Sequence, residues 1–339
     1  MRISPAALFA YVTLVGCAAP GDFSTIGSIE RLDSSMDGLV PRDAEIEVLA
    51  EGFDWSEGPL WVGGEDGFLL FSDIPANRIW RWDPSSGASV YLDQSGYLGE
   101  LPRPGYVEPD EPGSNGLLLD AAGRLVLCQH GLRQVGRMAA PLDAPWPEYE
   151  SIAARWNGKR FNSPNDAVYR SNGDLYFTDP PYGLAGKMDD PAKEIDFQGV
   201  YRVTPSGEVT LLTSEMSRPN GIAFSPDERT LYVANSDPER AVWMAFPVTA
   251  GGTLGEGRVL FDATHLVPDL PGLPDGLAVD PEGHLFATGP GGVLVLTPGG
   301  RHLGTILTGK PTSNCTFGSG GDTLYITADE VVARVKLRR

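Results

Sequence analysis

Arg218-Pro-Asn-Gly-Ile-Ala-Phe224 sets an asparagine and a glycine directly before a short apolar run, and this pattern decides the fold because it recurs. Ser163-Pro-Asn-Asp-Ala-Val168 and Leu273-Pro-Asp-Gly-Leu-Ala-Val-Asp280 repeat it closely. Three further copies keep a polar residue before the apolar run: Glu57-Gly-Pro-Leu-Trp61, Ser114-Asn-Gly-Leu-Leu-Leu-Asp120 and Thr312-Ser-Asn-Cys-Thr-Phe317. Six copies along one chain indicate a repeat architecture.

Each apolar run is followed by a turn and a second apolar run, as in Ser171-Asn-Gly-Asp-Leu-Tyr-Phe177 and Asp280-Pro-Glu-Gly-His-Leu-Phe286. Asn-Gly and Pro-Glu-Gly turns between apolar runs are hairpin signals. The copies are spaced by roughly fifty residues, about the length of a four-stranded blade with its connection. The 42 Gly and 29 Pro residues also suit short strands and tight turns. We therefore predict an all-β fold, a six-bladed β-propeller over residues 44–339.

The apolar alternation of Glu45-Ile-Glu-Val-Leu-Ala50 comes before the first copy. We predict that it forms the outer strand of the last blade. This pairing would close the ring and leave no sheet edge exposed.

One polar residue precedes the innermost strand of each blade, where that strand begins at the central channel. The six positions are Glu57, Asn115, Asn165, Asn220, Asp275 and Asn314. Two carboxylates and several amide oxygens around one point suit a hard cation, Ca²⁺ above all, with Zn²⁺ and Mn²⁺ as alternatives. The absence of His and Cys from these positions argues against a typical zinc, copper or iron–sulfur site. A single copy is equally a turn former, but six in register predict a central metal site.

Several motifs resemble the SMP-30/gluconolactonase/LRE-like family from about residue 45 to the end of the chain. They are Glu57-Gly-Pro, Arg160-Phe-Asn-Ser-Pro-Asn-Asp166, Phe177-Thr-Asp-Pro-Pro-Tyr-Gly183, Arg218-Pro-Asn-Gly221 and Pro274-Asp-Gly276. The resemblance implies a six-bladed propeller with an axial divalent ion that hydrolyses sugar-acid lactones or related esters. It implies that Glu57, Asn165, Asn220 and Asp275 are the metal ligands, and that Asn115 is a substrate contact beside the metal.

Calcium acidifies its own water weakly, so a nearby base should help to remove a proton. Asp275 is the first candidate for that base, although it could act as a ligand only. His130 follows the apolar run Leu125-Val-Leu-Cys-Gln129 and is the second candidate, as a base, a substrate contact or a structural residue. Asp179 is assigned to substrate binding, with a turn cap as the alternative, and Asn314 is assigned to substrate binding.

Three long insertions, 96–113, 138–159 and 182–198, are expected to roof the site. No G-x-S-x-G context surrounds a serine, which disfavours a serine hydrolase. The leading interpretation is a metal-dependent lactonase. The alternatives are a phosphotriester or organophosphate hydrolase using the same metal, and a non-catalytic binding propeller anchored at the cell surface.

The N-terminus carries Arg2, a short apolar run and then Leu14-Val-Gly-Cys17, which resembles the lipobox of bacterial lipoproteins. The resemblance implies cleavage before Cys17 and acylation of that residue. We predict a signal peptide over 1–17, a tether over 18–43, and a protein anchored by lipid in the bacterial cell envelope, facing the periplasm or exterior. A plain secretory signal and a soluble secreted protein are the alternative. Cys128 and Cys315 are expected to be buried free thiols.

The formal net charge of −19 repels phosphate backbones, so nucleic acid is not an expected partner. The expected partner is a small-molecule lactone or ester, and the lipid at Cys17 is the only expected membrane contact. We expect the protein to be a monomer.

Overall fold

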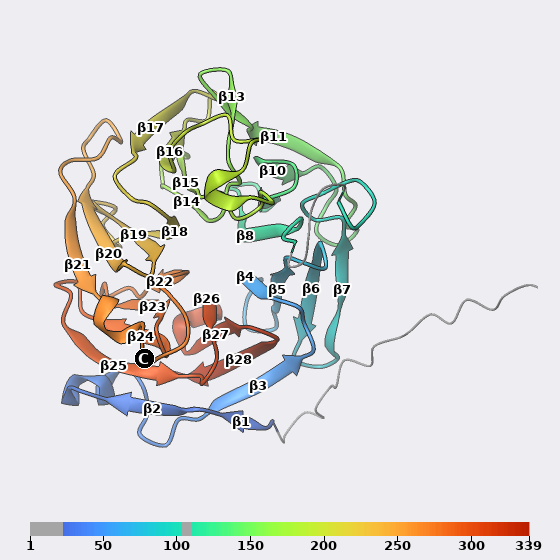
Figure 1. Cartoon of the computed structure of the whole chain (residues 1–339). Helices are drawn as coiled ribbons and strands as arrows, with labels where there is room; N and C mark the ends of the chain where they lie inside the picture. The colour runs from blue at the N-terminus through green and yellow to red at the C-terminus, as the bar shows by residue number, and fades with distance from the viewer. Residues whose placement is uncertain (1–22, 104–109, 339) are drawn as a thin grey trace, which may run out of the picture.

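The computed structural model describes residues 23–103 and 110–338. Its strands form six larger sheets and one two-stranded sheet. The six larger sheets are arranged in a ring about a central channel, and the chain passes from one to the next around that ring (Figure 1). The predicted six-bladed propeller is confirmed. Cys17 and the predicted signal peptide lie outside the described residues.

The first three blades each contain four antiparallel strands, and the chain enters each blade at its innermost strand. Blade 1 comprises β4 (Ser56–Val62), β5 (Phe68–Asp73), β6 (Arg78–Asp83) and β7 (Gly87–Asp93). Blade 2 comprises β8 (Ser114–Leu119), β9 (Leu125–Gln129), β10 (Gln134–Met138) and β11 (Tyr149–Ala153). Blade 3 comprises β14 (Ala167–Tyr169), β15 (Leu175–Asp179), β16 (Gly199–Val203) and β17 (Val209–Thr213). A small hairpin between blades 2 and 3 comprises β12 (Arg155–Trp156) and β13 (Lys159–Arg160).

Blades 4 and 5 follow the same plan, with short 3₁₀ turns in the connections. Blade 4 comprises β18 (Pro219–Phe224), β19 (Thr230–Asp237), β20 (Arg240–Pro247) and β21 (Arg258–Asp262). Blade 5 comprises β22 (Leu277–Val279), β23 (Leu285–Gly289), β24 (Gly292–Leu296) and β25 (His302–Leu307). The 3₁₀ turns of the structure are η1 (Ser34–Gly38), η2 (Lys187–Asp189), η3 (Thr264–Leu266) and η4 (Ser319–Gly321).

Blade 6 closes the ring with strands from both ends of the described chain. It comprises β26 (Thr312–Phe317), β27 (Thr323–Ala328), β28 (Val331–Lys336) and β3 (Ile46–Glu51). The antiparallel pairing of β3 with β28 sets Glu47 opposite Arg334, and Arg334 Nε donates to Glu47 Oε2 at 2.6 Å. The prediction that residues 45–50 form the outer strand of the last blade is confirmed.

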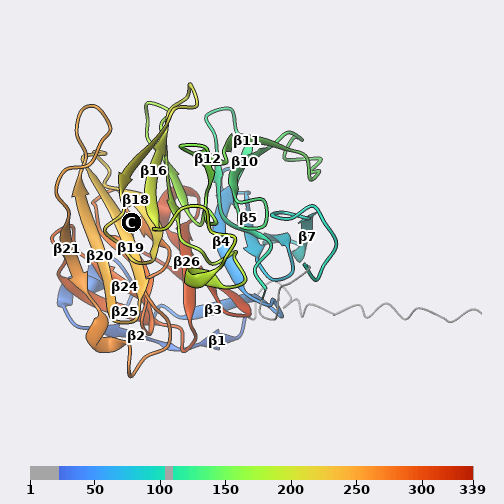
Figure 2. The same cartoon turned by 45° about the horizontal axis from the view of Figure 1, so that its top comes forward.

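The described part of the predicted tether, residues 23–43, packs on the propeller instead. β1 (Thr25–Ile26) pairs with β3 and β2 (Ser28–Arg31) pairs with β25, so both strands lie along the outer edge of the ring (Figures 1 and 2). Met36 and Val40 are fully buried in one hydrophobic cluster. The tether prediction was therefore wrong for these residues, because a few spaced apolar side chains suffice to bury a segment that lacks clear periodicity.

The core lies between adjacent blades, where the second and third strands carry almost continuous buried runs. Trp82, Trp243 and Tyr201 are among its largest buried side chains, and Tyr201 stacks on Phe177 with ring centroids 5.4 Å apart. Cys128 and Cys315 are buried and free, as expected. No helix in the described part of the chain has the length and hydrophobicity needed to cross a membrane.

Candidate active site

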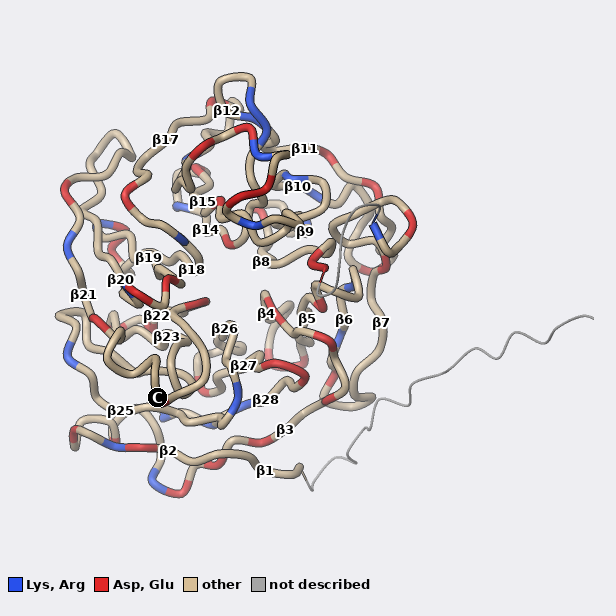
Figure 3. The backbone as a smooth tube through the Cα atoms, in the orientation of Figure 1, with Lys and Arg blue, Asp and Glu red and all other residues tan. Residues whose placement is uncertain are grey.

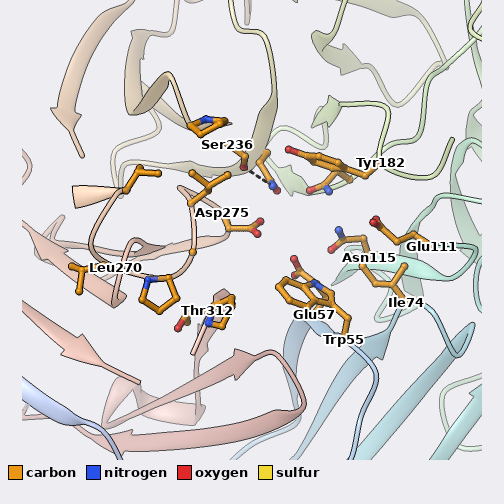
Figure 4. A pocket seen from close by; sticks show the side chains of 18 residues that line it. Trp55, Glu57, Ile74, Glu111, Asn115, Tyr182, Ser236, Leu270, Asp275 and Thr312 are labelled. Carbon is orange, nitrogen blue, oxygen red and sulfur yellow. Dashed lines mark hydrogen bonds between the residues drawn. The ribbon is translucent and has the colours of Figure 1, made fainter. Parts of the chain in front are cut away.

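A pocket of about 540 Å³ opens at one end of the central channel, and five of the six predicted polar positions line it. They are Glu57, Asn115, Asn165, Asn220 and Asp275. The side chains of Glu57, Asn115 and Asp275 point toward one another across this pocket (Figure 4). The trace also shows acidic residues beside β4 and β22, where the first and fifth blades meet the channel (Figure 3). The structure thus brings these five predicted residues together.

Irregular pairing where the innermost strands begin explains how the polar side chains reach the channel. The pairing register shifts between Glu57 and Leu60 in β4, between Ser114 and Leu117 in β8, and just after Pro219 in β18. Such a bulge bends the strand and redirects one side chain away from the regular alternation. In these three blades the bulge therefore turns the polar residue toward the axis.

Glycines in these phrases let neighbouring blades approach closely. Gly58 has a positive φ of 50°, and a Cβ there would collide with the carbonyl group of Asn115. A Cβ at Gly221 would likewise collide with the carbonyl group of Asp275. Glycine at these two positions thus permits the candidate site residues to sit around one small opening.

Hydroxyl groups on the second strands fix the backbone of the site. Each donates to a carbonyl oxygen in or beside the polar phrase of the next blade. The pairs are Ser72 with Asn115 at 2.8 Å, Thr178 with Asn220 at 2.7 Å and Thr288 with Ser313 at 2.8 Å. Sequence analysis missed these residues, although Ser or Thr recurs near the end of the second strand in most blades.

Two of the three carboxylates that line the pocket, Glu57 and Asp275, are strongly desolvated. Burial raises the pKa of Glu57 to about 8, although its Oε2 accepts a hydrogen bond from the Gly58 amide at 2.8 Å. Burial and the nearby charge of Glu57 raise the pKa of Asp275 well above its usual range. Carboxylates placed this way favour protons or a bound cation, which would relieve their repulsion.

Two of the residues that line the pocket each carry a buried oxygen atom without a hydrogen-bond partner. Among the described residues, neither Asp275 Oδ1 nor Asn115 Oδ1 has a hydrogen-bond partner. Buried polar atoms without partners are rare and call for an ion or a ligand. No group of three or more His, Cys, Asp or Glu suited to a metal occurs in the described part of the chain. A cation here would therefore depend on amide oxygens as well as carboxylates, a donor set that suits Ca²⁺.

The two pocket asparagines of blades 3 and 4 are held firmly. Asn165 donates its backbone N–H to Thr178 O at 2.9 Å, and its carbonyl accepts from the Gly116 amide at 2.8 Å. Asn220 Nδ2 donates to Ser236 Oγ at 2.8 Å, so its amide oxygen is the end left to face a ligand. Both asparagines are almost fully buried, which limits their side chains to few conformations.

His130 is fully buried and does not line the pocket. Its Nδ1 lies 3.8 Å from Oε2 of Glu111, which does line the pocket. Burial, with the charges of Lys187 and Arg103, lowers the pKa of His130 to about 3, so the ring is neutral at pH 7. His130 therefore lies behind the pocket wall, beside Glu111, which forms part of that wall.

Asp179 and Asn314 also lie away from the pocket lining. Both oxygens of Asp179 accept backbone N–H groups, from Asn162 and Ser163, each at 2.8 Å. Asp73 occupies the corresponding position in blade 1 and accepts from the backbone of Asp54 and Trp55. This repeated geometry matches the turn-cap alternative for Asp179.

Asn314 lies behind Glu57. Its Nδ2 donates to Glu57 Oε2 at 3.3 Å, and its Oδ1 accepts from the Cys315 amide at 2.8 Å. It borders a second, smaller cavity of about 180 Å³ in the channel, together with Asp166. Asn314 is therefore placed to orient Glu57.

Other pocket residues were not predicted individually. Glu111 and Tyr182 come from two of the insertions expected to roof the site, 96–113 and 182–198, whereas no lining residue comes from 138–159. Trp55 precedes the Glu57 phrase, and an apolar wall comes from Val267, Leu270 and Leu273. Insertion length was the only sequence signal for the first two, and it could not single out a side chain.

A six-bladed propeller with one acidic, amide-lined pocket on its axis is the class of protein that the fold and the site define. The chain belongs to the SMP-30/Gluconolactonase/LRE-like family, whose model matches residues 55–330. The family resemblance expected from the sequence is thereby confirmed.

Three similar proteins illustrate the match. A gluconolactonase from Zymomonas mobilis is 39% identical over 98% of this chain and 94% of its own length. The solved structure of a gluconolactonase from Xanthomonas campestris is 32% identical, with a TM-score of 0.77 over 96% of this chain and 99% of that chain. A 6-deoxy-6-sulfogluconolactonase from Pseudomonas putida is 28% identical over 80% of this chain and 82% of its own length.

Proposed function

We propose that this protein is a lactone hydrolase that opens a sugar-acid lactone or a related ester in the axial pocket. The observation that carries this proposal is the pairing of two desolvated carboxylates, Glu57 and Asp275, with pocket-facing amides and with an Asp275 oxygen that lacks a partner. The gluconolactonases of Zymomonas mobilis and Xanthomonas campestris support it, because both match this chain over nearly its whole length.

We further propose that the pocket holds one divalent cation, Ca²⁺ in the first instance. Glu57, Asn165, Asn220 and Asp275 would hold it, since all four line the pocket and supply oxygen donors. When bound, such an ion would supply Lewis-acid polarisation of the lactone carbonyl and would stabilise negative charge on its oxygen.

The residues of the chain supply the remaining chemistry. Asp275 takes a proton from water, whose oxygen attacks the carbonyl carbon of the lactone. The ring C–O bond then breaks, and the leaving oxygen recovers the proton from Asp275, which gives the hydroxy acid. Asn115 offers its amide to the substrate, and Tyr182 remains a phenol donor because burial raises its pKa.

A chelator experiment on a substrate panel tests the proposal. We expect hydrolysis of aldonolactones or acyl lactones that stops with chelator, returns with Ca²⁺, and leaves the circular dichroism spectrum unchanged. Elemental analysis should find about one divalent ion per chain. Turnover of phosphotriesters alone would replace the proposal with phosphotriester hydrolysis. Metal binding without any turnover would favour a binding propeller.

We also propose that the protein is anchored in the bacterial cell envelope through a lipid on Cys17, as its lipobox-like sequence Leu14-Val-Gly-Cys17 suggests. Two or more acyl chains would make that anchoring stable. The propeller would then face the periplasm or the exterior.

A further inference from the structure

An ion pair joins two insertions at the wall of the pocket. Glu111 lines the pocket, with a quarter of its side chain exposed, and its Oε1 accepts a hydrogen bond from Lys187 Nζ at 2.7 Å. Lys187 Nζ also donates to the carbonyl oxygen of Tyr182 at 2.5 Å. Figure 4 shows Glu111 beside Asn115 at the edge of the pocket, on the same side as Tyr182. The acid therefore faces the space where a substrate would sit, and Lys187 holds it from behind.

The described part of the chain places no positive side chain in the pocket lining to receive an anion. Among the described residues that line it, none is Lys, Arg or His, whereas Glu57, Glu111 and Asp275 are acidic. Two arginines lie near residues of the pocket wall without lining the pocket themselves. Arg103 forms a buried ion pair with Asp110, and the charge of Arg218 acts to lower the pKa of Tyr182 and of Asp237.

We propose that the Glu111–Lys187 ion pair determines the substrate specificity of the pocket. Glu111 accepts hydrogen bonds from the hydroxyls of a neutral polyhydroxylated lactone. Lactones that bear a second anionic group are rejected. This inference rests on the lactone hydrolysis proposed above and adds a charge selection to it. The rejected class comprises lactones with a phosphate or sulfonate on the chain away from the carbonyl.

The chemistry of the pair explains both halves of the selection. A carboxylate accepts hydrogen bonds from several hydroxyls, and such charge-assisted bonds are stronger than neutral ones. A phosphate or sulfonate entering the same space would lose water and find Glu111 instead of a cation. A buried anion without a partner is strongly disfavoured. Lys187 cannot rescue it, because its ammonium is already bonded to Glu111.

Charge selection also differs from a purely structural role of the pair. If Lys187 only tied the insertion 182–198 to the pocket wall, loss of the pair would weaken neutral and anionic ligands alike. If the pair selects by charge, its loss should change the ratio between the two ligands. That ratio is the quantity to measure.

The test uses the full chain and two matched ligand pairs. The first pair is glucono-1,5-lactone and its 6-phosphate, compared by kcat/KM. The second is a neutral polyhydroxy δ-lactam and its 6-phosphate, compared by calorimetric Kd, which requires no hydrolysis. The wild type should prefer the neutral member of each pair by about 10-fold to 100-fold.

Glu111→Gln is the informative variant, because glutamine keeps an oxygen for Lys187 but removes the negative charge. Lys187 then keeps an unmatched positive charge behind the pocket wall. We expect the neutral ligand to lose about 10-fold and the phosphorylated ligand to gain about 10-fold. The double variant Glu111→Gln with Lys187→Met should lose that gain, since no cation remains.

Three results would overturn the inference. They are equal wild-type affinity for the neutral and phosphorylated lactams, an unchanged ratio in Glu111→Gln, and a gain that persists in the double variant. Failure of the proposed function looks different, because the wild type would then hydrolyse neither lactone. The lactam affinities would still decide the charge selection in that case.

Discussion

Asn220 Nδ2 donates a hydrogen bond to Ser236 Oγ at 2.8 Å, and the same hydroxyl donates to the carbonyl of Pro274, the residue before Asp275. One serine on β19 therefore connects two candidate metal ligands from neighbouring blades. Its two bonds fix the orientation of the Asn220 amide and the position of the chain that carries Asp275. A hydroxyl in this place would orient the candidate ligands through these two hydrogen bonds.

Replacing Ser236 with Ala should therefore weaken cation binding while the propeller stays folded. Loss of residues that orient metal ligands typically costs 10-fold to 100-fold in affinity, and we expect a Ca²⁺ Kd raised by about that factor. Isothermal titration with Ca²⁺ measures it. Ser95→Ala is the control, because Ser95 is also buried and hydrogen-bonded but lies outside the pocket lining. Equal effects of the two variants would show that Ser236 does not orient the ligands.

His130 should make the fold sensitive to acid. Its pKa is lowered from 6.5 to about 3 in the folded chain, so the folded state binds fewer protons than the unfolded state between these values. The contribution of His130 to stability is thus fully present above pH 6.5 and is lost as the pH falls toward 3. Within that window, each pH unit changes the contribution of His130 to the free energy of unfolding by at most about 1.4 kcal/mol.

His130→Gln removes this titration. Between pH 7 and pH 5, the wild type should lose about 2 kcal/mol more unfolding free energy than the variant. Buried carboxyl groups with raised pKa values act in the opposite direction, but both proteins share them, so they cancel in the comparison. Urea unfolding at each pH provides the values, and the exposed His265→Gln is the control. Parallel pH profiles for the wild type and His130→Gln would contradict a buried neutral histidine.

The sequence carries the blade pattern because each innermost strand repeats the same local phrase. Asn220 and Asp275 were found in this way, since a polar residue, a small residue and an apolar run recur at one position of every blade. The outer strand before the first copy was also predictable, because a propeller leaves one strand position to be filled by the other end of the chain. Local repetition thus predicted the ring and the five polar residues at the centre of the pocket.

The residues that form the wall of the pocket could not be predicted from the repeat. Glu111 and Lys187 are 76 residues apart in two insertions that occur once each, so no repeat could align them. His130 and Asp179 were near the right places in the sequence, but neither of them lines the pocket. A residue's place at the end of a predicted strand indicates the region of the fold in which it lies. The direction of its side chain depends on the loops that pack over that strand end.

Substitution of Met36 tests whether residues 23–43 pack on the propeller. Its side chain is fully buried among residues of blades 5 and 6. Met36→Ala should lower the free energy of unfolding by about 2–5 kcal/mol, because it removes buried methylene groups and leaves a cavity. Denaturant unfolding measures the loss. Leu32→Ala is the control, since Leu32 is 57% exposed in the same segment and should have little effect. A negligible effect of Met36→Ala would favour the original prediction that this segment is a tether.

The proposed lipid anchor can be tested by replacing a single sulfur atom, that of Cys17. Replacing Cys17 with Ser removes the thiol that the lipobox-like sequence presents for acylation. We expect this variant to move from the membrane fraction to the soluble fraction and to lose incorporation of a labelled fatty acid. Cys128→Ser should keep both properties, because Cys128 is buried in β9. A wild-type protein that is already soluble and unlabelled would rule out the anchor.

Asp275 and Glu57 should separate the roles of base and ligand. Asp275→Asn keeps an oxygen that can coordinate a cation but loses the proton acceptor, so kcat should fall by about 10²-fold to 10⁴-fold even at saturating Ca²⁺. Glu57→Gln loses no base, and its rate should recover as added Ca²⁺ fills the site. His130→Ala should have a smaller effect on kcat, because His130 lies behind Glu111 and does not line the pocket. The decisive measurement is kcat at saturating Ca²⁺ for all three variants, with metal content checked in each. If Asp275→Asn recovered its full kcat at saturating Ca²⁺ and His130→Ala did not, His130 would be the base and Asp275 would be a ligand only.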